Sequence, residues 1–292
     1  MAELLDGKKL AVELKAQLKD EIRRIKSDFG KTPRVINIMV GNDPGSCAYA
    51  KSQMKVAEEI GVDYKLKNVS ASISQEELTN LILKLNMDPD VNGIMLHKPV
   101  PMHIDYHVLA NHVDTVKDLE GINVANIGKM ILGETNIIPC TPASVMEHIK
   151  STGMDLRGKE AVVVGHSGIV GKPLSLLLLE QYATVTVCHI ATSEAGKLVD
   201  HVKRADILIV AVGKPGVIDG GWVKKNAVVI DVGINRVNGK IVGDVQFDEA
   251  MKRAAYITPV PGGVGPVTVV MLMRNAIEAF HLQKIKKKKV FL

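Results

Sequence analysis

The stretch AVVVGHSGIVGKP, residues 161–173, decides the fold of this chain. Four consecutive apolar residues, with charged residues before them, predict a short strand buried on both faces, as in a parallel sheet. Gly165 ends that strand, and Gly171 opens a leucine-rich segment with a proline near its first turn, which predicts a helix. Strand, glycine turn and helix form the first half of a βαβ unit, whose helix start can bind a phosphate.

The glycine turn departs from the usual dinucleotide fingerprint. Gly165, Ser167 and Val170 stand where GxGxxG has its glycines, and Gly171 comes one position late. A plain tight turn therefore stays open as an alternative to a dinucleotide site. The next predicted strand, ATVTVCHI (183–190), carries no acidic residue at its end to hold a free ribose hydroxyl. The absence of such an acidic residue favours NADP over NAD.

Composition limits the function classes. A chain of 292 residues with 46% hydrophobic content is long enough for two domains with ample core. An aromatic content of 3% argues against the stacking surfaces of single-stranded nucleic-acid binders. Much of the net charge of +5 lies in the run Lys286–Lys289, which we interpret as a solvated tail rather than a nucleic-acid or membrane patch.

Neither cysteines nor apolar runs indicate a secreted or membrane protein. The three cysteines form no CxxC pair, so neither a disulfide framework nor a zinc site is predicted, and Cys140 is interpreted as a packed thiol. Three histidines between residues 103 and 112 lack a matching carboxylate pattern, and no metal site is predicted there. No apolar run reaches about 18 residues, and the start is a charged amphipathic helix, so we expect a cytoplasmic protein.

Strand and helix alternate along the rest of the chain. The apolar spacing of Leu4–Ser27 predicts a long surface helix, and residues 34–41 predict a strand. Ser74, with glutamates soon after it, opens another predicted helix. The predicted class is α/β with two domains, an N-terminal substrate domain and a Rossmann-type parallel-sheet cofactor domain, with a cleft between them.

Three loops carry unusual polar or glycine-rich sequence. The strand GIMLHKPVP ends in His97, Lys98 and Pro99, and ligands collect at the strand ends of open α/β sheets. KDLEGIN, residues 117–123, is an acidic loop before a predicted helix start. In TPVPGGVGPVT, residues 258–268, two prolines fix φ while glycines allow close backbone approach, so the loop presents bare peptide groups.

These motifs, taken in order with Tyr49, IPCTP and IDVGIN, resemble one family along essentially the whole chain. The sequence resembles the methylenetetrahydrofolate dehydrogenase/methenyltetrahydrofolate cyclohydrolase family. The resemblance implies a homodimer, with residues 1–140 as the folate-binding catalytic domain, completed by the C-terminal helix 267–292, and residues 141–266 as the NAD(P)-binding domain. It implies a folate one-carbon substrate, the cofactor NADP with NAD as the alternative, and neither a nucleic-acid nor a membrane partner.

The resemblance also assigns residues in the folate pocket. Tyr49 matches the tyrosine that lies against the folate ring, and the lysine four positions later is Gln53 here. His97 replaces the strand-end glutamine, Pro99 follows it, and Glu120 replaces the aspartate that holds the pterin edge. Residues matching the folate-side loop are Pro261, Gly262, Gly263 and Val264.

Gly165, Ser167 and Ile234 match the family's cofactor-binding pattern. His166 stands in place of an arginine and Ile190 in place of a serine, so two contacts expected for a ribose phosphate are missing.

The implied reaction is oxidation of 5,10-methylenetetrahydrofolate by hydride transfer to NAD(P). Because Gln53 cannot titrate, we expect the second, cyclohydrolase step to be weak or absent. Two alternatives stay open. One is a fully bifunctional enzyme with a relocated proton donor such as His97 or Lys98, and the other is a re-purposed or non-catalytic relative whose cleft binds another ligand.

Overall fold

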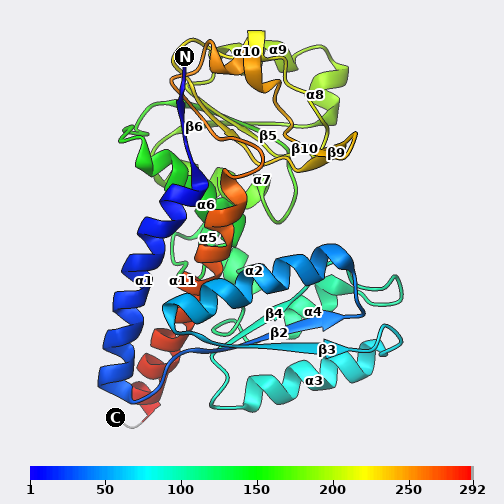
Figure 1. Ribbon diagram of the computed structural model, residues 1–292, viewed down its shortest axis with the longest axis vertical. Helices are drawn as coiled ribbons and strands as arrows, with labels where there is room; N and C mark the ends of the chain where they lie inside the picture. The colour runs from blue at the N-terminus through cyan, green and yellow to red at the C-terminus, as the bar shows by residue number, and fades with distance from the viewer. Residues whose placement is uncertain (291–292) are drawn as a thin grey trace. The chain divides into compact units, whose positions relative to one another are not determined.

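The computed structural model describes the backbone of residues 1–290 and the side chains of residues 1–285 (Figure 1). The run Lys286–Lys289 therefore lies outside the described side chains, and its interpretation as a solvated tail stays a prediction. The chain divides into two compact units, and each combines segments that are distant in sequence. Residues 1–12 and 141–268 form one unit, and residues 13–140 and 269–292 form the other.

The unit built on residues 13–140 has a three-stranded parallel sheet with the order β3-β2-β4. Helix α11 runs from the 141–268 unit into this one, as α1 does at the other end of the chain. The elements are α1 (Gly7–Phe29), β2 (Arg34–Val40), α2 (Pro44–Ile60), β3 (Asp63–Val69), α3 (Gln75–Met87), β4 (Gly93–Leu96), α4 (Tyr106–His112), α5 (Val124–Ile131) and α11 (Val264–Val290).

Alternation along β2 and β4 divides this sheet into two faces. Ile38, Ile94 and Leu96 point toward α3 and α4 and form one apolar core with them. The residues between them, Asn37 and Met95, point to the other face and contact α2. One face is therefore an apolar core, and the other carries polar side chains that are buried beneath a helix.

The other unit contains a six-stranded parallel sheet with the order β1-β11-β8-β7-β5-β6. The same unit also contains a separate two-stranded antiparallel hairpin. The elements are β1 (Glu3–Leu4), α6 (Cys140–Ser151), β5 (Glu160–Val164), α7 (Gly171–Glu180), β6 (Thr184–Cys188), α8 (Ile190–Glu194), α9 (Leu198–Arg204), β7 (Ile207–Val210), η1 (Gly220–Trp222), β8 (Val228–Asp231), β9 (Asn235–Val237), β10 (Lys240–Val242), α10 (Phe247–Met251) and β11 (Tyr256–Ile257).

Strand β5 is the predicted central strand. Its neighbours are β6 on one side and β7 on the other, so the strand order reverses at β5, as in doubly wound sheets. Val162 and Val164 belong to the core on one face, and Ala161 and Val163 to the core on the other. The predicted α/β class with a Rossmann-type parallel sheet is confirmed.

The first predicted helix begins later than expected. The sequence predicts a helix from Leu4, but Glu3 and Leu4 form β1, paired in parallel with Tyr256 and Ile257. The helix starts at Gly7. The amphipathic spacing does not distinguish a strand of two residues from the start of the helix, because the pairing partner lies at the other end of the chain.

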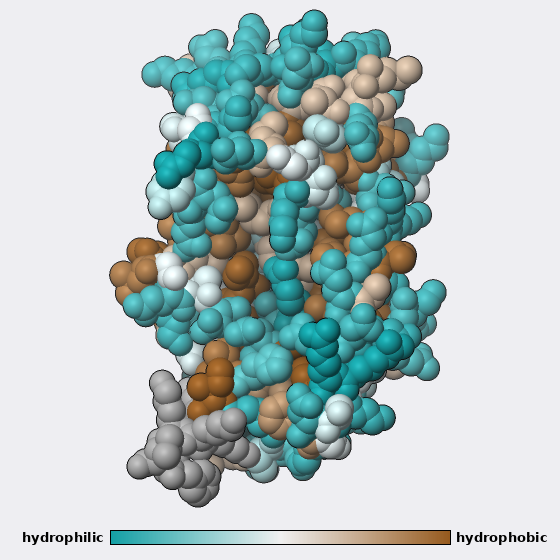
Figure 2. All heavy atoms as spheres, turned by 90° about the vertical axis from the view of Figure 1, so that its left-hand side faces the viewer, coloured by the Kyte–Doolittle hydropathy of each residue, from teal (hydrophilic) through white to brown (hydrophobic). Residues whose placement is uncertain are grey.

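The surface bears on the membrane question. Within residues 1–290, no helix is long and apolar enough to cross a membrane. Figure 2 shows a face that is largely hydrophilic, with its apolar residues in separate patches.

Candidate functional site

Helix α2 positions the first two predicted folate-pocket residues. Asp43 caps the helix by accepting a hydrogen bond from the Ser46 amide at 2.8 Å, and a left-handed glycine ends it. Tyr49 and Gln53 lie one helical turn apart. Ser46 also donates a hydrogen bond to the carbonyl oxygen of Lys98 at 2.9 Å, which joins the start of α2 to the end of β4.

Gln53 is fully buried in a neutral hydrogen-bond network. Its Oε1 accepts from Asn37 Nδ2 and from the Tyr64 hydroxyl, both at 2.7 Å. Asn37 Nδ2 also donates to the Tyr64 hydroxyl, and Gln53 Nε2 lies 3.4 Å from the sulfur of Met95. Burial raises the pKa of Tyr64. The neutral Gln53 network, defined as Asn37, Gln53 and Tyr64, therefore holds no group that exchanges a proton near neutral pH.

His97 follows β4 and lies beside Tyr49. The two rings meet edge to face with centroids 5.8 Å apart. His97 is 2% exposed, and its Nε2 has no hydrogen-bond partner among the described residues. Burial lowers its pKa, so the neutral imidazole is favoured. A buried ring nitrogen without a partner at a strand end is available to a ligand.

Glu120 lies beside the same strand end, because residues 117–119 run parallel to β4. The Leu119 amide donates to the Ile94 carbonyl, and an isolated parallel bridge pairs Ile94 with Asp118. Oε2 of Glu120 accepts from the Tyr106 hydroxyl at 2.8 Å. Burial raises the pKa of Glu120 to about 7, against the lowering effect of that hydrogen bond.

The preceding aspartate is part of the framework rather than a free acid. Asp118 is 3% exposed, and its carboxylate accepts hydrogen bonds from the Gly121 and Asn123 amides and from Asn126 Nδ2, at 2.8–3.1 Å. These contacts fix the loop and, with it, the direction of the Glu120 side chain. Of the two acids in KDLEGIN, Glu120 is therefore the one that can face a ligand.

The amide of Asn275, on α11, secures the other side of this loop. Its Nδ2 donates to the Leu119 carbonyl at 2.8 Å and to the Ile138 carbonyl at 2.7 Å. The thiol of Cys140 also donates to the Leu119 carbonyl at 3.4 Å, and burial raises its pKa. A raised pKa disfavours the reactive thiolate, which agrees with a packed thiol.

In the 141–268 unit, the glycine turn brings the end of β5 close to the start of α7. Gly165 has φ +123°, and a Cβ built on Gly171, the first residue of α7, would lie 2.0 Å from the Gly165 carbonyl oxygen. His166 and Ser167 are exposed in the turn, and the Ser167 hydroxyl accepts from the Val170 amide at 3.2 Å. A bare turn at the point where the strand order reverses fits a nucleotide phosphate.

The two departures in this loop lie near each other. The His166 ring lies 5.2 Å from the ring of His189, which immediately precedes Ile190. Ile190 is 68% exposed at the first position of α8. The exposed side chains of His166 and Ile190 therefore stand where the resemblance implies an arginine and a serine.

The remaining predicted residues belong to the same unit. Ile234 follows β8 and is 71% exposed. The folate-side residues Pro261–Val264 lead into α11, where the Val264 carbonyl accepts from the Ser144 hydroxyl at 2.9 Å. The structure thus groups Tyr49, His97, Gln53 and Glu120 in one unit, with Pro99 beside them. It groups the turn, Ile190, Ile234 and Pro261–Val264 in the other unit.

Three residues that contact the predicted folate-pocket residues escape the sequence analysis: Asn37, Tyr64 and Tyr106. A signal existed for Asn37, a polar residue within the otherwise apolar strand RVINIMV. Tyr64 and Tyr106 give none, since each follows from a packing contact with a distant segment. Lys98 also has a contact that the sequence does not predict. It is exposed, but its ammonium lies 3.7 Å from the Tyr106 ring centroid.

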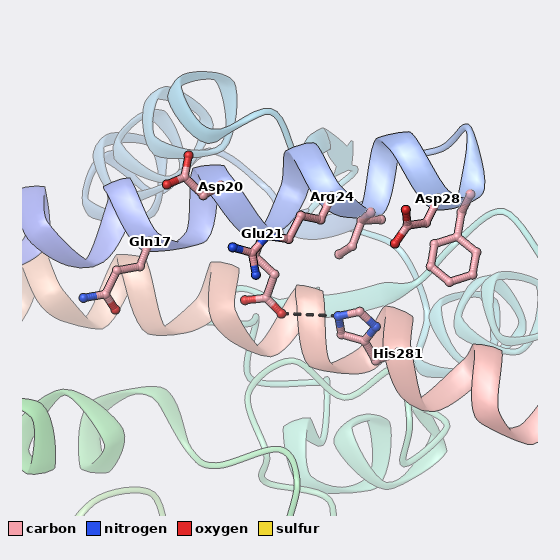
Figure 3. Close-up of a pocket in the computed structure, with 8 residues that line it drawn as sticks. Gln17, Asp20, Glu21, Arg24, Asp28 and His281 are labelled. Atoms are coloured by element: carbon pink, nitrogen blue, oxygen red, sulfur yellow. Dashed lines mark hydrogen bonds and ion pairs between the residues drawn. The ribbon is translucent and has the colours of Figure 1, made fainter.

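A separate groove lies between α1 and α11 (Figure 3). Its polar side chains include Asp20, Glu21 and Asp28, and Glu21 Oε1 lies 3.3 Å from Nε2 of His281. It contains none of the predicted site residues. Among the described residues, no group of three or more histidines, cysteines and acids could hold a metal ion.

Comparison with known proteins identifies the family. The catalytic domain of tetrahydrofolate dehydrogenase/cyclohydrolase matches residues 5–120, and the NAD(P)-binding domain of the same family matches residues 139–284. The bifunctional protein FolD of Acetivibrio thermocellus is 49% identical over 284 residues, which cover 97% of this chain and 98% of that protein.

Solved structures agree with these matches. The bifunctional FolD of Campylobacter jejuni is 42% identical with a TM-score of 0.93, covering 97% of this chain and all of that one. The FolD of Trypanosoma brucei, solved with NADP and an inhibitor, is 36% identical with a TM-score of 0.91, covering 96% of this chain and 98% of that one. This chain therefore belongs to the tetrahydrofolate dehydrogenase/cyclohydrolase family.

Proposed function

We propose that this chain oxidises 5,10-methylenetetrahydrofolate to 5,10-methenyltetrahydrofolate with NADP, and that it hydrolyses the methenyl product weakly or not at all. The first step moves a hydride from the one-carbon bridge to the nicotinamide and leaves a methenyl cation. Because the cation is resonance-stabilised, this step needs positioning more than acid–base chemistry. Tyr49, His97 and Glu120 form the surface that would hold the folate.

The hydrolysis step has different needs. Water adds to the bridge carbon, one carbon–nitrogen bond breaks, and protons must move to the leaving nitrogen and away from the water. In related proteins this chemistry is implied for a lysine at position 53. The observation that carries our proposal is that the Gln53 amide does not titrate near neutral pH and that its oxygen already accepts two hydrogen bonds.

A fully bifunctional enzyme is the second candidate, and two observations favour it. Burial raises the pKa of Glu120 to about 7, a value suited to a general acid or base. His97 Nε2 is buried without a partner. Either group could take the place of the missing lysine in proton transfer.

One assay separates the two candidates. Purified protein receives 5,10-methylenetetrahydrofolate with NADP, and in parallel with NAD, while reduced cofactor and methenyl product are followed together. We expect reduction with NADP and methenyl product that accumulates. Methenyl product that disappears as fast as it forms would establish the bifunctional candidate. A folded protein that reduces neither cofactor would overturn both.

The resemblance implies two further properties. We expect a homodimer, which sedimentation at several protein concentrations will test. A cytoplasmic location stays a prediction, and fractionation of the source cells will test it.

A further inference from the structure

Tyr106 joins two charged groups next to the folate pocket. Its side chain is buried, and its hydroxyl donates to Oε2 of Glu120 at 2.8 Å. The ammonium of Lys98 lies over the opposite part of the same side chain, 3.7 Å from the ring centroid. One phenol therefore contacts a carboxylate through its hydroxyl and a cation through its ring face.

The position of Tyr106 is fixed by the fold. It is the first residue of α4, which Asp105 caps by accepting hydrogen bonds from the His107 and Val108 amides at 2.9 and 3.1 Å. Its neighbours Ile104 and Leu109 are buried in the apolar core against α3. The hydroxyl therefore cannot follow a rotating carboxylate, and Glu120 must come to it.

Glu120 needs such a partner. The resemblance implies an aspartate at this position, and a glutamate has one more methylene and one more rotatable bond. A carboxylate that must meet the N–H donors of a pterin loses affinity when it samples several rotamers. A fixed donor on one oxygen restricts those rotamers and leaves the remaining lone pairs for a ligand.

We propose that Tyr106 is a positioning residue for folate recognition, which holds the carboxylate of Glu120 in the orientation that accepts the N–H groups of the pterin, with Lys98 supporting it over the ring. The inference rests on the proposed function, because it assumes a pterin substrate. It adds a role for two residues that do not contact the reacting atoms.

The electrostatics around Glu120 agree with this role. Its pKa is raised by burial and by Asp118, and is lowered by the Tyr106 hydrogen bond and by Lys98. Tyr49 and Cys140 also lie within electrostatic range of it. Removing the Tyr106 hydroxyl therefore raises the pKa of Glu120 further, so the carboxylate loses its charge at a higher pH.

The test measures binding directly. The dissociation constant for tetrahydrofolate is determined by calorimetry from about pH 6 to about pH 9 for the wild type and Tyr106→Phe. Loss of one hydrogen bond to a charged group predicts roughly tenfold weaker binding near about pH 7. The pH midpoint of binding should move upward, and NADP binding should not change. Tyr182→Phe, an exposed tyrosine in the other unit, is the matched control.

A double-mutant cycle shows whether Tyr106 acts through Glu120. The Tyr106→Phe change is repeated in Glu120→Ala, where we expect it to have no further effect. In Glu120→Gln, the pH midpoint should disappear, which gives a second readout if the alanine variant does not fold. Lys98→Met should shift the midpoint upward, as Tyr106→Phe does.

The outcomes separate this inference from the proposed function. An unchanged dissociation constant in Tyr106→Phe, or an equal loss with and without Glu120, overturns the inference while NADP reduction by the wild type is unaffected. Wild-type protein that binds tetrahydrofolate but reduces no cofactor overturns the proposed function alone. Wild-type protein that does not bind tetrahydrofolate overturns both.

Discussion

The neutral Gln53 network and the corner formed by Lys98, Tyr106 and Glu120 flank the same strand end, and they differ in charge. In the first, Asn37 and Gln53 are fully buried and Tyr64 is half-buried, and the amide and phenol groups keep their protons near neutral pH. The second combines a carboxyl group of pKa about 7 with an exposed ammonium. Proton exchange in this pocket is therefore concentrated on the Glu120 side.

This difference separates the two chemical steps. Hydride transfer needs a surface that positions the substrate against the cofactor, and a network of neutral groups can form such a surface. Hydrolysis needs proton transfer, which the resemblance places at the position that Gln53 occupies, and a neutral network does not supply it there. Under the proposed function, a single amide in place of an amine separates one working step from one weakened step. The following changes test that division, from the largest effect to the smallest.

The largest effect is expected from Gln53→Lys. The new ammonium can donate to Asn37 Oδ1, which is buried without a partner among the described residues. A titratable group at this position should raise methenyl hydrolysis by about 10²–10³-fold and change NADP reduction little. The lifetime of the methenyl product gives the measurement. Gln53→Met, of similar length but without a titratable group, is the control. Equal rates of methenyl hydrolysis in both variants would show that a titratable group at position 53 does not control this step.

A smaller effect is expected from Glu120→Gln, which changes how the free energy of unfolding depends on pH. The pKa of Glu120 is raised from 4.5 to about 7, so between these values the folded state holds more protons than the unfolded state. Stability contributed by this group is therefore lost as pH rises through that window. Glu120→Gln removes the loss and should be more stable than wild type by about 2–3 kcal/mol at about pH 8.

Urea unfolding of the two proteins at several pH values measures this difference. Burial also raises the pKa of Asp231, to about 6, but this carboxyl is present in both proteins and cancels in the difference. A stability difference that does not change between about pH 5 and about pH 8 would show that Glu120 is not the group responsible.

The smallest effect is expected from Tyr64→Phe. It removes the hydrogen bond from the Tyr64 hydroxyl to Gln53 Oε1 and the one that this hydroxyl accepts from Asn37, and it leaves the bond from Asn37 to Gln53 in place. We expect a loss of about 1 kcal/mol of unfolding free energy, equal at every pH below about 9. Thermal unfolding across that pH range is the measurement. A pH-dependent loss would mean that the network contains a titrating group after all.

The sequence predicts the architecture and much of the site, and the reasons are physical. An apolar run such as Ala161–Val164 has few alternatives to a buried parallel strand, and the structure has β5 there. Tyr49 and Gln53 are one turn apart on a helix whose capping residues can be identified in the sequence, so their proximity follows from local geometry. Glu120 lies beside the end of β4, which His97 follows, because residues 117–119 run beside that strand, and no local pattern predicts this.

The partners of these residues are less predictable. Tyr106 reaches Glu120 only because α4 packs on α3 in the apolar core, and Tyr64 reaches Gln53 only through the pairing of β2 with β3. Such contacts depend on the register of strands and on helix packing, which are set by the whole unit. Their chemical consequence, one neutral and one titratable side of a pocket, is visible only in three dimensions.

The N-terminal strand has a consequence for how the chain is made. Glu3 and Leu4 pair with Tyr256 and Ile257, and Gly7 lies so close to Gly263 that a Cβ on it would be 1.7 Å from the carbonyl oxygen. On the ribosome, the first strand therefore waits for a partner that is synthesised about 250 residues later. By contrast, the apolar core that β2 and β4 form with α3 and α4 lies within residues 36–122 and needs no later segment. The six-stranded sheet is therefore completed only after Ile257 has been synthesised, so the nascent chain exposes apolar surface of the 141–268 unit to chaperones until then.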